Sequence, residues 1–184
     1  MSSDKALRAV RRLTGEAVES HPMKRKTTAL VLITLAALAS SHTGLHTSYA
    51  QDSSASKVAR LLEESSLGYS KASNNVWSVP FQGKALPNFL VVASVQQDIL
   101  VLFVVVAEKK DIRVAPELMQ KMLKMNADLD RVKIGFDKDG DAFVRIDLSI
   151  RVLDVQEFKA NIEQVAAAAD ELFTAIKPFI KITK

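Results

Sequence analysis

Residues 131–176 constrain the fold of this chain more than any other stretch, because two hydrophobic periods follow one another there. Apolar residues alternate with polar ones over 132–136 and again over 144–150, which is the period of a half-buried β-strand. Residues 137–141 lie between them and contain three Asp and Gly140. A Gly can adopt the positive φ that a hairpin turn requires. The sequence therefore predicts an antiparallel β-hairpin.

A long amphipathic helix is predicted directly after the hairpin. Apolar residues recur there at alternating steps of three and four, which places them on one helical stripe. The stripe consists of Val155, Phe158, Ile162, Val165, Ala169, Leu172 and Ile176. Asp154 and Glu157 form a capping pair at the start of this helix, and Pro178 follows its end. A hairpin and a helix define a fold, but they carry no catalytic motif.

The residues before the hairpin predict the remaining elements. They are a short helix marked by Val58, Leu61, Leu62 and Ser65, strands over 69–72, 76–82, 89–95 and 99–107, and a helix that begins at Pro116. The order is helix, three to four strands, helix, two strands, helix. Because successive strands are joined by short turns, we expect an α+β fold with an antiparallel sheet packed by helices. Residues 51–184 suffice for one such domain.

The positive charge of the chain belongs to its first 50 residues. Seven of the 25 Lys and Arg and three of the 21 Asp and Glu lie in residues 1–50, so residues 51–184 carry 18 of each. A nucleic-acid-binding domain concentrates basic residues in its folded part. We therefore expect no nucleic-acid partner.

Residues 23–50 have the three parts of a secretory signal peptide. Lys24, Arg25 and Lys26 precede an apolar run over 27–39, and small residues stand at the positions read by a signal peptidase. The run is about 13 residues long, shorter than the roughly 20 of a spanning helix. The sequence predicts cleavage between Ala50 and Gln51, a periplasmic or secreted protein, and no membrane span after cleavage. Residues 1–22 are either an over-extended start or a disordered extension.

The chain beyond residue 50 lacks the residues of several common active sites. It contains no His and no Cys, so Ser–His and Cys–His pairs and His or Cys metal sites are excluded there. Asp137, Asp139, Asp141 and Asp147 form the densest group of carboxylates. Such a group could belong to a calcium-binding loop. That kind of loop, however, needs more oxygen ligands and a Glu at its twelfth position. We expect no catalytic, cofactor-binding or metal-binding residues.

Two groups of larger side chains have alternative interpretations. Trp77, Phe81 and Phe89 could form a stacking platform, and Met119, Met122 and Met125 could form an adaptable binding surface. Aromatic residues in strands are commonly half-buried, and the Met residues share one face of a helix. The sequence favours core positions for both groups.

The strand over 99–107 is apolar on both faces, unlike the hairpin strands. A sheet covered by helices on one side should alternate between apolar and polar residues, so something must cover the second face. The two longer helices could split between the faces, the first helix could fold over, or another chain could bind there. The candidate partner-binding face is lined either by Ile99, Val101, Phe103 and Val105 or by Leu100, Leu102, Val104 and Val106. We expect a homodimer or a bound hydrophobic protein segment on it.

The chain also resembles a known family. Leu123-Lys124-Met125-Asn126-Ala127 leads into a strand, an Asp-x-Asp-Gly turn, an alternating strand and a helix with Ala-Ala-Asp-Glu-Leu at 168–172. This pattern resembles the YbjN family, described as bacterial sensory-transduction regulators and similar in fold to type III secretion chaperones. The resemblance covers about residues 55–178. It implies a compact α+β domain that often forms dimers and has no known active site, whereas an export signal is unusual for the family.

These observations give three hypotheses about function. The first is an exported, non-enzymatic, chaperone-like binding module. The second is a hydrolase that works with carboxylates alone, for example a glycosidase, which would need two carboxyl groups in a cleft. The third is an envelope signalling regulator.

Overall fold

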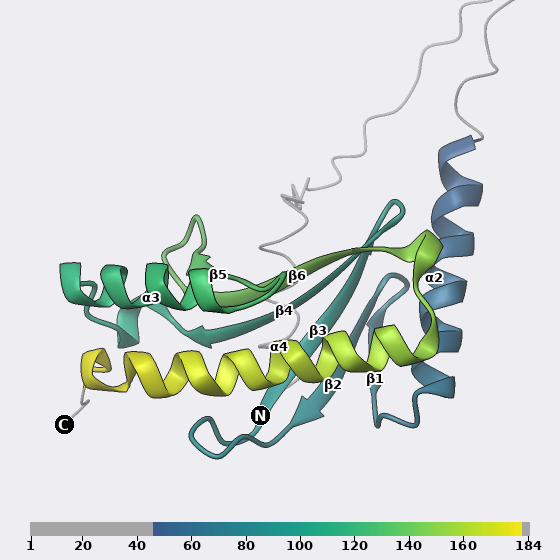
Figure 1. Ribbon diagram of the computed structural model, residues 1–184. Coiled ribbons are helices and arrows are strands. Elements are labelled where there is room, and N and C mark those ends of the chain that lie inside the picture. The colour runs from purple at the N-terminus through teal and green to yellow at the C-terminus, as the bar shows by residue number, and fades with distance from the viewer. Residues whose placement is uncertain (1–45, 182–184) are drawn as a thin grey trace, which may run out of the picture.

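The computed structural model describes residues 46–181, with side chains from residue 54 onward (Figure 1). The described elements are α2 (His46–Glu64), β1 (Ser70–Ser73), β2 (Val76–Phe81), β3 (Phe89–Gln96), β4 (Ile99–Ala107), α3 (Pro116–Asp128), β5 (Lys133–Phe136), β6 (Ala142–Ser149) and α4 (Val155–Ile176). This order is the one that the sequence predicts.

The strands form one antiparallel sheet. Within the described residues it has six strands in the order β1-β2-β3-β4-β6-β5, so α3 connects β4 to the far edge and β6 returns to pair with β4. The α+β class and the antiparallel pairing are confirmed. β4 has the predicted bounds, and the predicted ends of β1, β2 and β3 differ from the observed ends by one residue each.

The hairpin of β5 and β6 closes through the Asp-rich turn. The Gly140 N–H donates to the Asp137 carbonyl over 2.9 Å, and the Asp137 N–H donates to the Asp141 carbonyl over 3.0 Å. Gly140 has φ of 85°, a conformation that costs Gly little and other residues more. The predicted role of Gly140 is confirmed.

Helix α4 begins and ends where the sequence predicts. The Glu157 N–H donates to the Asp154 carboxylate over 2.8 Å, which satisfies one of the free amides of the first turn. The predicted stripe is largely buried against the sheet, and α4 contacts β3, β4 and β6. Phe158, Ile162 and Leu172 are fully buried. Each such side chain contributes about 1.5–3 kcal/mol relative to exposure.

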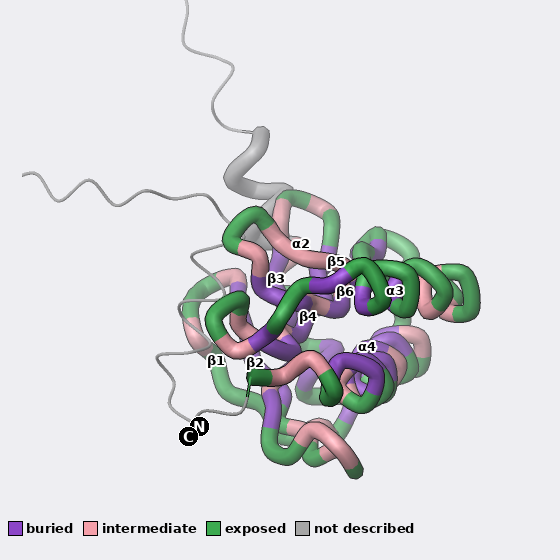
Figure 2. Tube along the Cα trace, turned by 90° about the vertical axis from the view of Figure 1, so that its left-hand side faces the viewer, coloured by how far each residue is buried: buried purple, intermediate pink, exposed green. Residues whose placement is uncertain are grey.

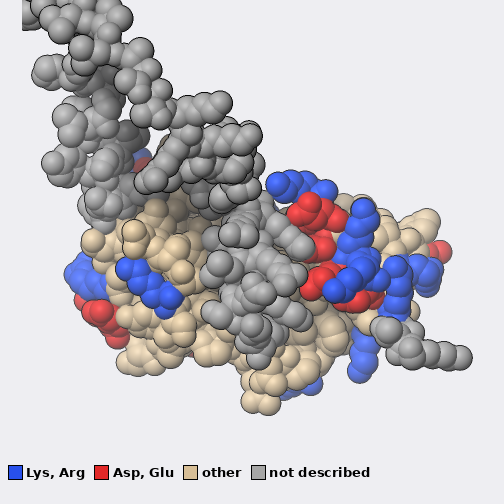
Figure 3. Space-filling model, turned by 180° about the vertical axis from the view of Figure 1, so that it is seen from behind, with Lys and Arg blue, Asp and Glu red and all other residues tan. Residues whose placement is uncertain are grey.

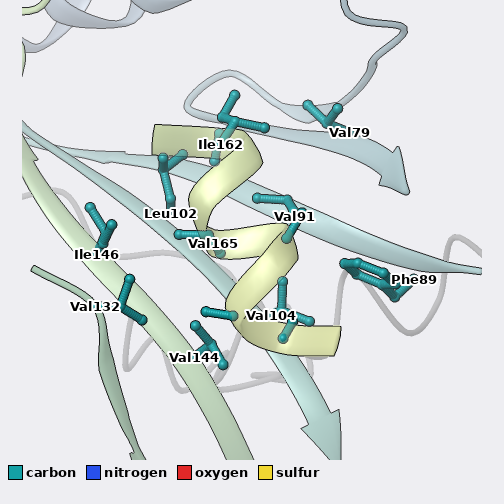
Figure 4. Close-up of a cluster of buried hydrophobic side chains, with 14 of the residues drawn as sticks. Val79, Phe89, Val91, Leu102, Val104, Val132, Val144, Ile146, Ile162 and Val165 are labelled. Atoms are coloured by element: carbon teal, nitrogen blue, oxygen red, sulfur yellow. The ribbon is translucent and has the colours of Figure 1, made fainter. Parts of the chain in front are cut away.

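All three described helices pack on the same face of the sheet, which we call the inner face. The buried residues of α2 (Val58, Leu61 and Leu62) and of α3 (Leu118 and Met122) belong to the same hydrophobic core as the α4 stripe. Figure 4 shows strand side chains directed toward Ile162 and Val165 of α4. Burial is concentrated in the central strands and along α4 (Figure 2). The possibility that the helices divide between the two faces is therefore wrong for the described part of the chain.

Helix α2 starts earlier than its apolar residues indicate. The sequence places its first marker at Val58, whereas the helix begins at His46 and includes Ala50 and Gln51. Residues 51–56 carry no hydrophobic period, so periodicity could not reveal the first turns of this helix. Residues 1–45, which hold most of the predicted signal peptide, lie outside the described residues.

Candidate functional site

The face of the sheet opposite the three helices carries a second, separate hydrophobic cluster. We call this side the outer face and the cluster, which consists of Val76, Val92, Val101 and Phe103, the outer cluster. It joins three strands, because Val92 of β3 lies opposite Phe103 of β4, and Val76 of β2 lies opposite Ser94 of β3. In the complete chain these four side chains are buried, with exposed fractions of 0 to 3 %. Among the described residues, the partly buried hydrophobic residues packed against it are Ala72 and Val105.

The structure decides which side chains of β4 point to which face. Leu100, Leu102, Val104 and Val106 belong to the core under the helices. Val101, Phe103 and Val105 point to the outer face, and Ile99, in phase with them, is 37 % exposed. The second candidate set is therefore core, and the first set is the one that could meet a partner.

A network of three charged residues borders the outer cluster on β5 and β6. Asp147 lies opposite Val101, and Arg145 lies opposite Phe103. Asp147 accepts hydrogen bonds from Lys133 Nζ over 2.8 Å and from Arg145 Nε over 2.6 Å. Burial raises the pKa of Asp147, but these two hydrogen bonds and the positive charges behind them outweigh it and hold the pKa below its ordinary value.

Figure 3 shows the side of the molecule opposite α4. Lys, Arg, Asp and Glu side chains gather toward one end of this view, and much of the rest of the visible described surface is tan. The outer cluster is apolar, and Lys133, Arg145 and Asp147 lie beside it. A partner that covered it would meet an apolar patch with a charged border, which is the usual arrangement of a protein-binding surface.

The Asp-rich turn uses its carboxylates to hold the backbone. Asp137 Oδ1 accepts the N–H groups of Asp139 and Asp141, each over 2.9 Å. Asp141 is 3 % exposed, and its Oδ1 accepts the Lys109 N–H over 2.9 Å. The turn is thus tied to the segment after β4. In the described part of the chain, no group of three or more His, Cys, Asp or Glu is arranged to hold a metal ion.

The arrangement expected of a carboxylate hydrolase is not found in the described residues. An open depression of about 590 Å³ lies beside the Asp-rich turn, and its lining includes Glu108, Asp139 and Asp141 together with three Lys. Of the described carboxylates, only Asp141 is buried. Two buried carboxyl groups facing one cavity, the feature that would favour a glycosidase, are therefore absent from this part of the chain.

The aromatic residues proposed as a stacking platform lie in the core. Trp77 and Phe89 are 2 % and 5 % exposed, and Phe81 stacks on Phe89 with ring centroids 6.0 Å apart. The core interpretation also holds for Met122. It is wrong for Met119, which is 42 % exposed.

Sequence reasoning missed a carboxylate that anchors a distant loop. Asp170 of α4 accepts the N–H groups of Leu86, Ala85 and Lys84 over 2.7, 2.8 and 3.2 Å. The hydrogen bond from Leu86 is the largest cause of a lowered pKa of Asp170, and the other two lower it further. Gly83 leaves room for this contact, since a Cβ there would lie 2.1 Å from Asp170 Oδ1. No local pattern connects residues so far apart in the sequence.

The sequence predicts cleavage between Ala50 and Gln51 and no membrane span after cleavage. Ala50 and Gln51 lie within α2, and cleavage between them stays a prediction. Within residues 46–181, no helix is both long enough and apolar enough to cross a membrane.

Comparisons with known proteins agree with this architecture. The chain is similar to one in the crystal structure of the ExsC–ExsE complex, with 13 % identity, a TM-score of 0.51, and coverage of 68 % of this chain and 95 % of that one. It is also similar to YbjN from E. coli, with 10 % identity, a TM-score of 0.49, and coverage of 69 % and 95 %. The corresponding values for the Yersinia pestis type III secretion chaperone SycH are 13 %, 0.44, 65 % and 98 %.

The sequence itself gives a family match. No curated protein matches it. The model of the YbjN family, described as "Putative bacterial sensory transduction regulator", matches residues 54–178. This range agrees with the resemblance seen in the sequence and includes the whole sheet and both later helices. The chain belongs to the YbjN family.

Proposed function

We propose that this protein is an exported, non-enzymatic, chaperone-like binding module that holds a protein partner on its outer face. The partner is a second copy of the chain, which makes a homodimer, or a hydrophobic segment of another protein. The observation that carries this proposal is the outer cluster, which lies on the side of the sheet without any of the three described helices.

The energetics of the outer cluster favour a partner. A Val or Phe side chain left in water forgoes about 1.5–3 kcal/mol relative to burial. If nothing covered the outer cluster, its side chains would form a contiguous apolar surface, which is uncommon on monomers and usually marks an interaction site. One chain of similar fold was crystallised in the ExsC–ExsE complex, so a chain with this fold can hold another chain.

The chemistry of the described residues supports a binding role over catalysis. The Asp-rich turn hydrogen-bonds its own backbone, and Asp147 and Asp170 hold other parts of the fold. Absence of His and Cys beyond residue 50 removes the common nucleophile–base pairs.

A role as an envelope signalling regulator is the second candidate. The description of the family as sensory transduction regulators favours it. In that role the outer face would bind the protein to which the signal passes. Export to the periplasm or beyond rests on the signal-peptide pattern of residues 23–50.

Light scattering of two variants of β4 tests the binding face. Phe103 and Val104 are neighbours that point to the outer and inner faces. For the chain that begins at Gln51, we expect a mass above that of one copy, or a mass that rises when a hydrophobic peptide is added. Phe103→Asp should reduce the mass to that of a folded monomer. Val104→Asp should unfold the domain, because it places an unpaired charge in the core.

A less destabilising substitution covers the case in which Phe103→Asp does not fold. Val105 lies on the outer face and is only partly buried, so Val105→Asp should disrupt association at a smaller cost in stability. If the chain is monomeric with and without peptide, and if the outer and inner variants unfold alike, β4 is core on both sides and the proposal is wrong.

A further inference from the structure

The strand β5 forms one edge of the sheet, and an edge strand is a place where another chain can add a strand. Among the described strands, β5 pairs with β6 alone, on one side. In an antiparallel pair, the main-chain groups of successive residues point alternately toward the neighbouring strand and away from it. The outward groups of an unprotected edge recruit further strands, and proteins commonly block them.

Asn126 of α3 occupies the outward groups at the centre of β5. Its Nδ2 donates to the Ile134 carbonyl over 2.8 Å, and its Oδ1 accepts the Ile134 N–H over 2.7 Å. A carboxamide has the donor and acceptor of a peptide group, so this pair of bonds reproduces those that a neighbouring strand would make. Both groups of Ile134 are therefore bonded to α3, on the side away from β6.

The start of β5 is held in a similar way. The Val132 N–H donates to the Asp130 carbonyl over 2.7 Å, across Arg131, whose φ is 61°. Helix α3 itself is fixed over this edge, since it contacts β5 and buries Leu118 and Met122 in the core. The closed edge is thus supported by both packing and hydrogen bonds.

We propose that Asn126 takes the place of a seventh strand and closes the β5 edge against strand addition by another chain. Self-association at β5 is then suppressed, and β1 is the other edge of the sheet in the described part of the chain. This role differs from partner binding on the outer face, because it concerns main-chain groups at the edge rather than side chains on the face. Asn126 is one of the residues of the family-like segment 123–127, and no role in binding or catalysis otherwise involves it.

The test is Asn126→Ala in the complete chain, with Gln120→Ala as the matched control. Gln120 is an exposed carboxamide on the same helix. We expect the Ile134 amide to exchange hydrogen about tenfold faster in Asn126→Ala, the change that corresponds to loss of one ordinary hydrogen bond. We also expect the mass from light scattering to increase with concentration in Asn126→Ala beyond that of the wild-type chain, and Gln120→Ala to match wild type in both measurements.

A double variant separates the edge from the outer face. In Asn126→Ala combined with Phe103→Asp, the added association should persist, because it uses β5 and not the outer cluster. Its loss in the double variant would assign the association to the outer face and overturn the edge proposal.

Asn126→Asp gives a decision even if the Ala variant fails to fold. The carboxylate keeps the bond from the Ile134 N–H but cannot donate to the Ile134 carbonyl. We expect a folded chain with slow exchange at the Ile134 amide and increased association. If the folded Asp and Ala variants keep the wild-type mass at all concentrations, Asn126 does not close this edge and the proposal is wrong.

Discussion

At the scale of single residues, Asp170 joins two parts of the chain that are far apart in sequence. Its carboxylate accepts hydrogen bonds from three amide N–H groups of the loop between β2 and β3. Gly83 lets this loop approach α4 closely. Hydrogen bonds to a charged acceptor are stronger than those to a neutral one. The negative charge of Asp170 is therefore part of what orders this loop.

Asp170→Asn should loosen the loop without unfolding the domain. The substituted amide keeps one oxygen acceptor but loses the charge, so we expect faster hydrogen exchange at the amides of Ala85 and Leu86 and a lower melting temperature. Hydrogen exchange followed by NMR measures the local effect. Glu171→Gln is the matched control, because Glu171 is an exposed neighbouring carboxylate, and it should behave like wild type. Equal exchange rates in the two variants would contradict the anchoring role.

The lowered pKa of Asp170 gives this anchor a defined pH dependence. A carboxylate whose pKa is lower in the folded state stabilises the fold above its unfolded pKa, about 3.9, and loses that effect as the pH falls through the folded pKa. The difference in melting temperature between wild type and Asp170→Asn should therefore be constant near neutral pH and disappear in acid. The amide shifts of Ala85 and Leu86 should report the titration.

The role of a residue could be predicted from the sequence where its hydrogen-bond partner is close along the chain. Asp154 caps the amide three residues later, and Gly140 lies in a four-residue turn. Asp170 and Asn126 bind main-chain groups of other elements, and neither contact leaves a local pattern. Met119 shared the helix face of Met122 in the sequence, but α3 lies at the edge of the sheet and buries only part of that face.

At the scale of elements, the hydrophobic period predicted the helices and strands that are half-buried. The β5–β6 hairpin, α3 and α4 each have one apolar and one polar side, and all three are found where their periods indicate. The first turns of α2 have no such period and were missed. For β4 the sequence predicted the bounds but not the orientation, because a strand that is apolar on both faces gives no signal for which face the helices cover.

The position of β4 explains why its two faces differ in role. It is paired on both sides, with β3 and with β6, and it runs under α4. The inner side chains of β4 are thus core residues of the domain, whereas its outer side chains Val101 and Phe103 belong to the outer cluster. The same strand connects the stability of the domain to the proposed binding surface.

At the scale of the whole molecule, the proposed export would determine which form of the chain meets a partner. If residues 23–50 act as a signal peptide, the exported protein begins at Gln51 and carries equal numbers of basic and acidic residues. Intact-mass analysis of protein from the native cell envelope should give the mass of residues 51–184. A mass that still includes residues 30–40 would show that the segment is retained.

The central claim is that the outer face holds a protein partner, and site-directed crosslinking tests it most directly. The chain contains no Cys, so a single introduced Cys can carry a photoreactive benzophenone group at one chosen position. Val105→Cys places the group on the partly buried rim of the outer cluster. Glu171→Cys places it on the exposed side of α4. Both variants would be irradiated as purified chains and in envelope extracts.

We expect crosslinks from position 105 to a second copy of the chain or to a hydrophobic segment of another protein, and none from position 171. Peptide mass spectrometry then identifies which of the two partners is bound. If position 105 gives no crosslink to another chain, or if position 171 gives the same products, the outer face does not hold the partner and the claim is contradicted.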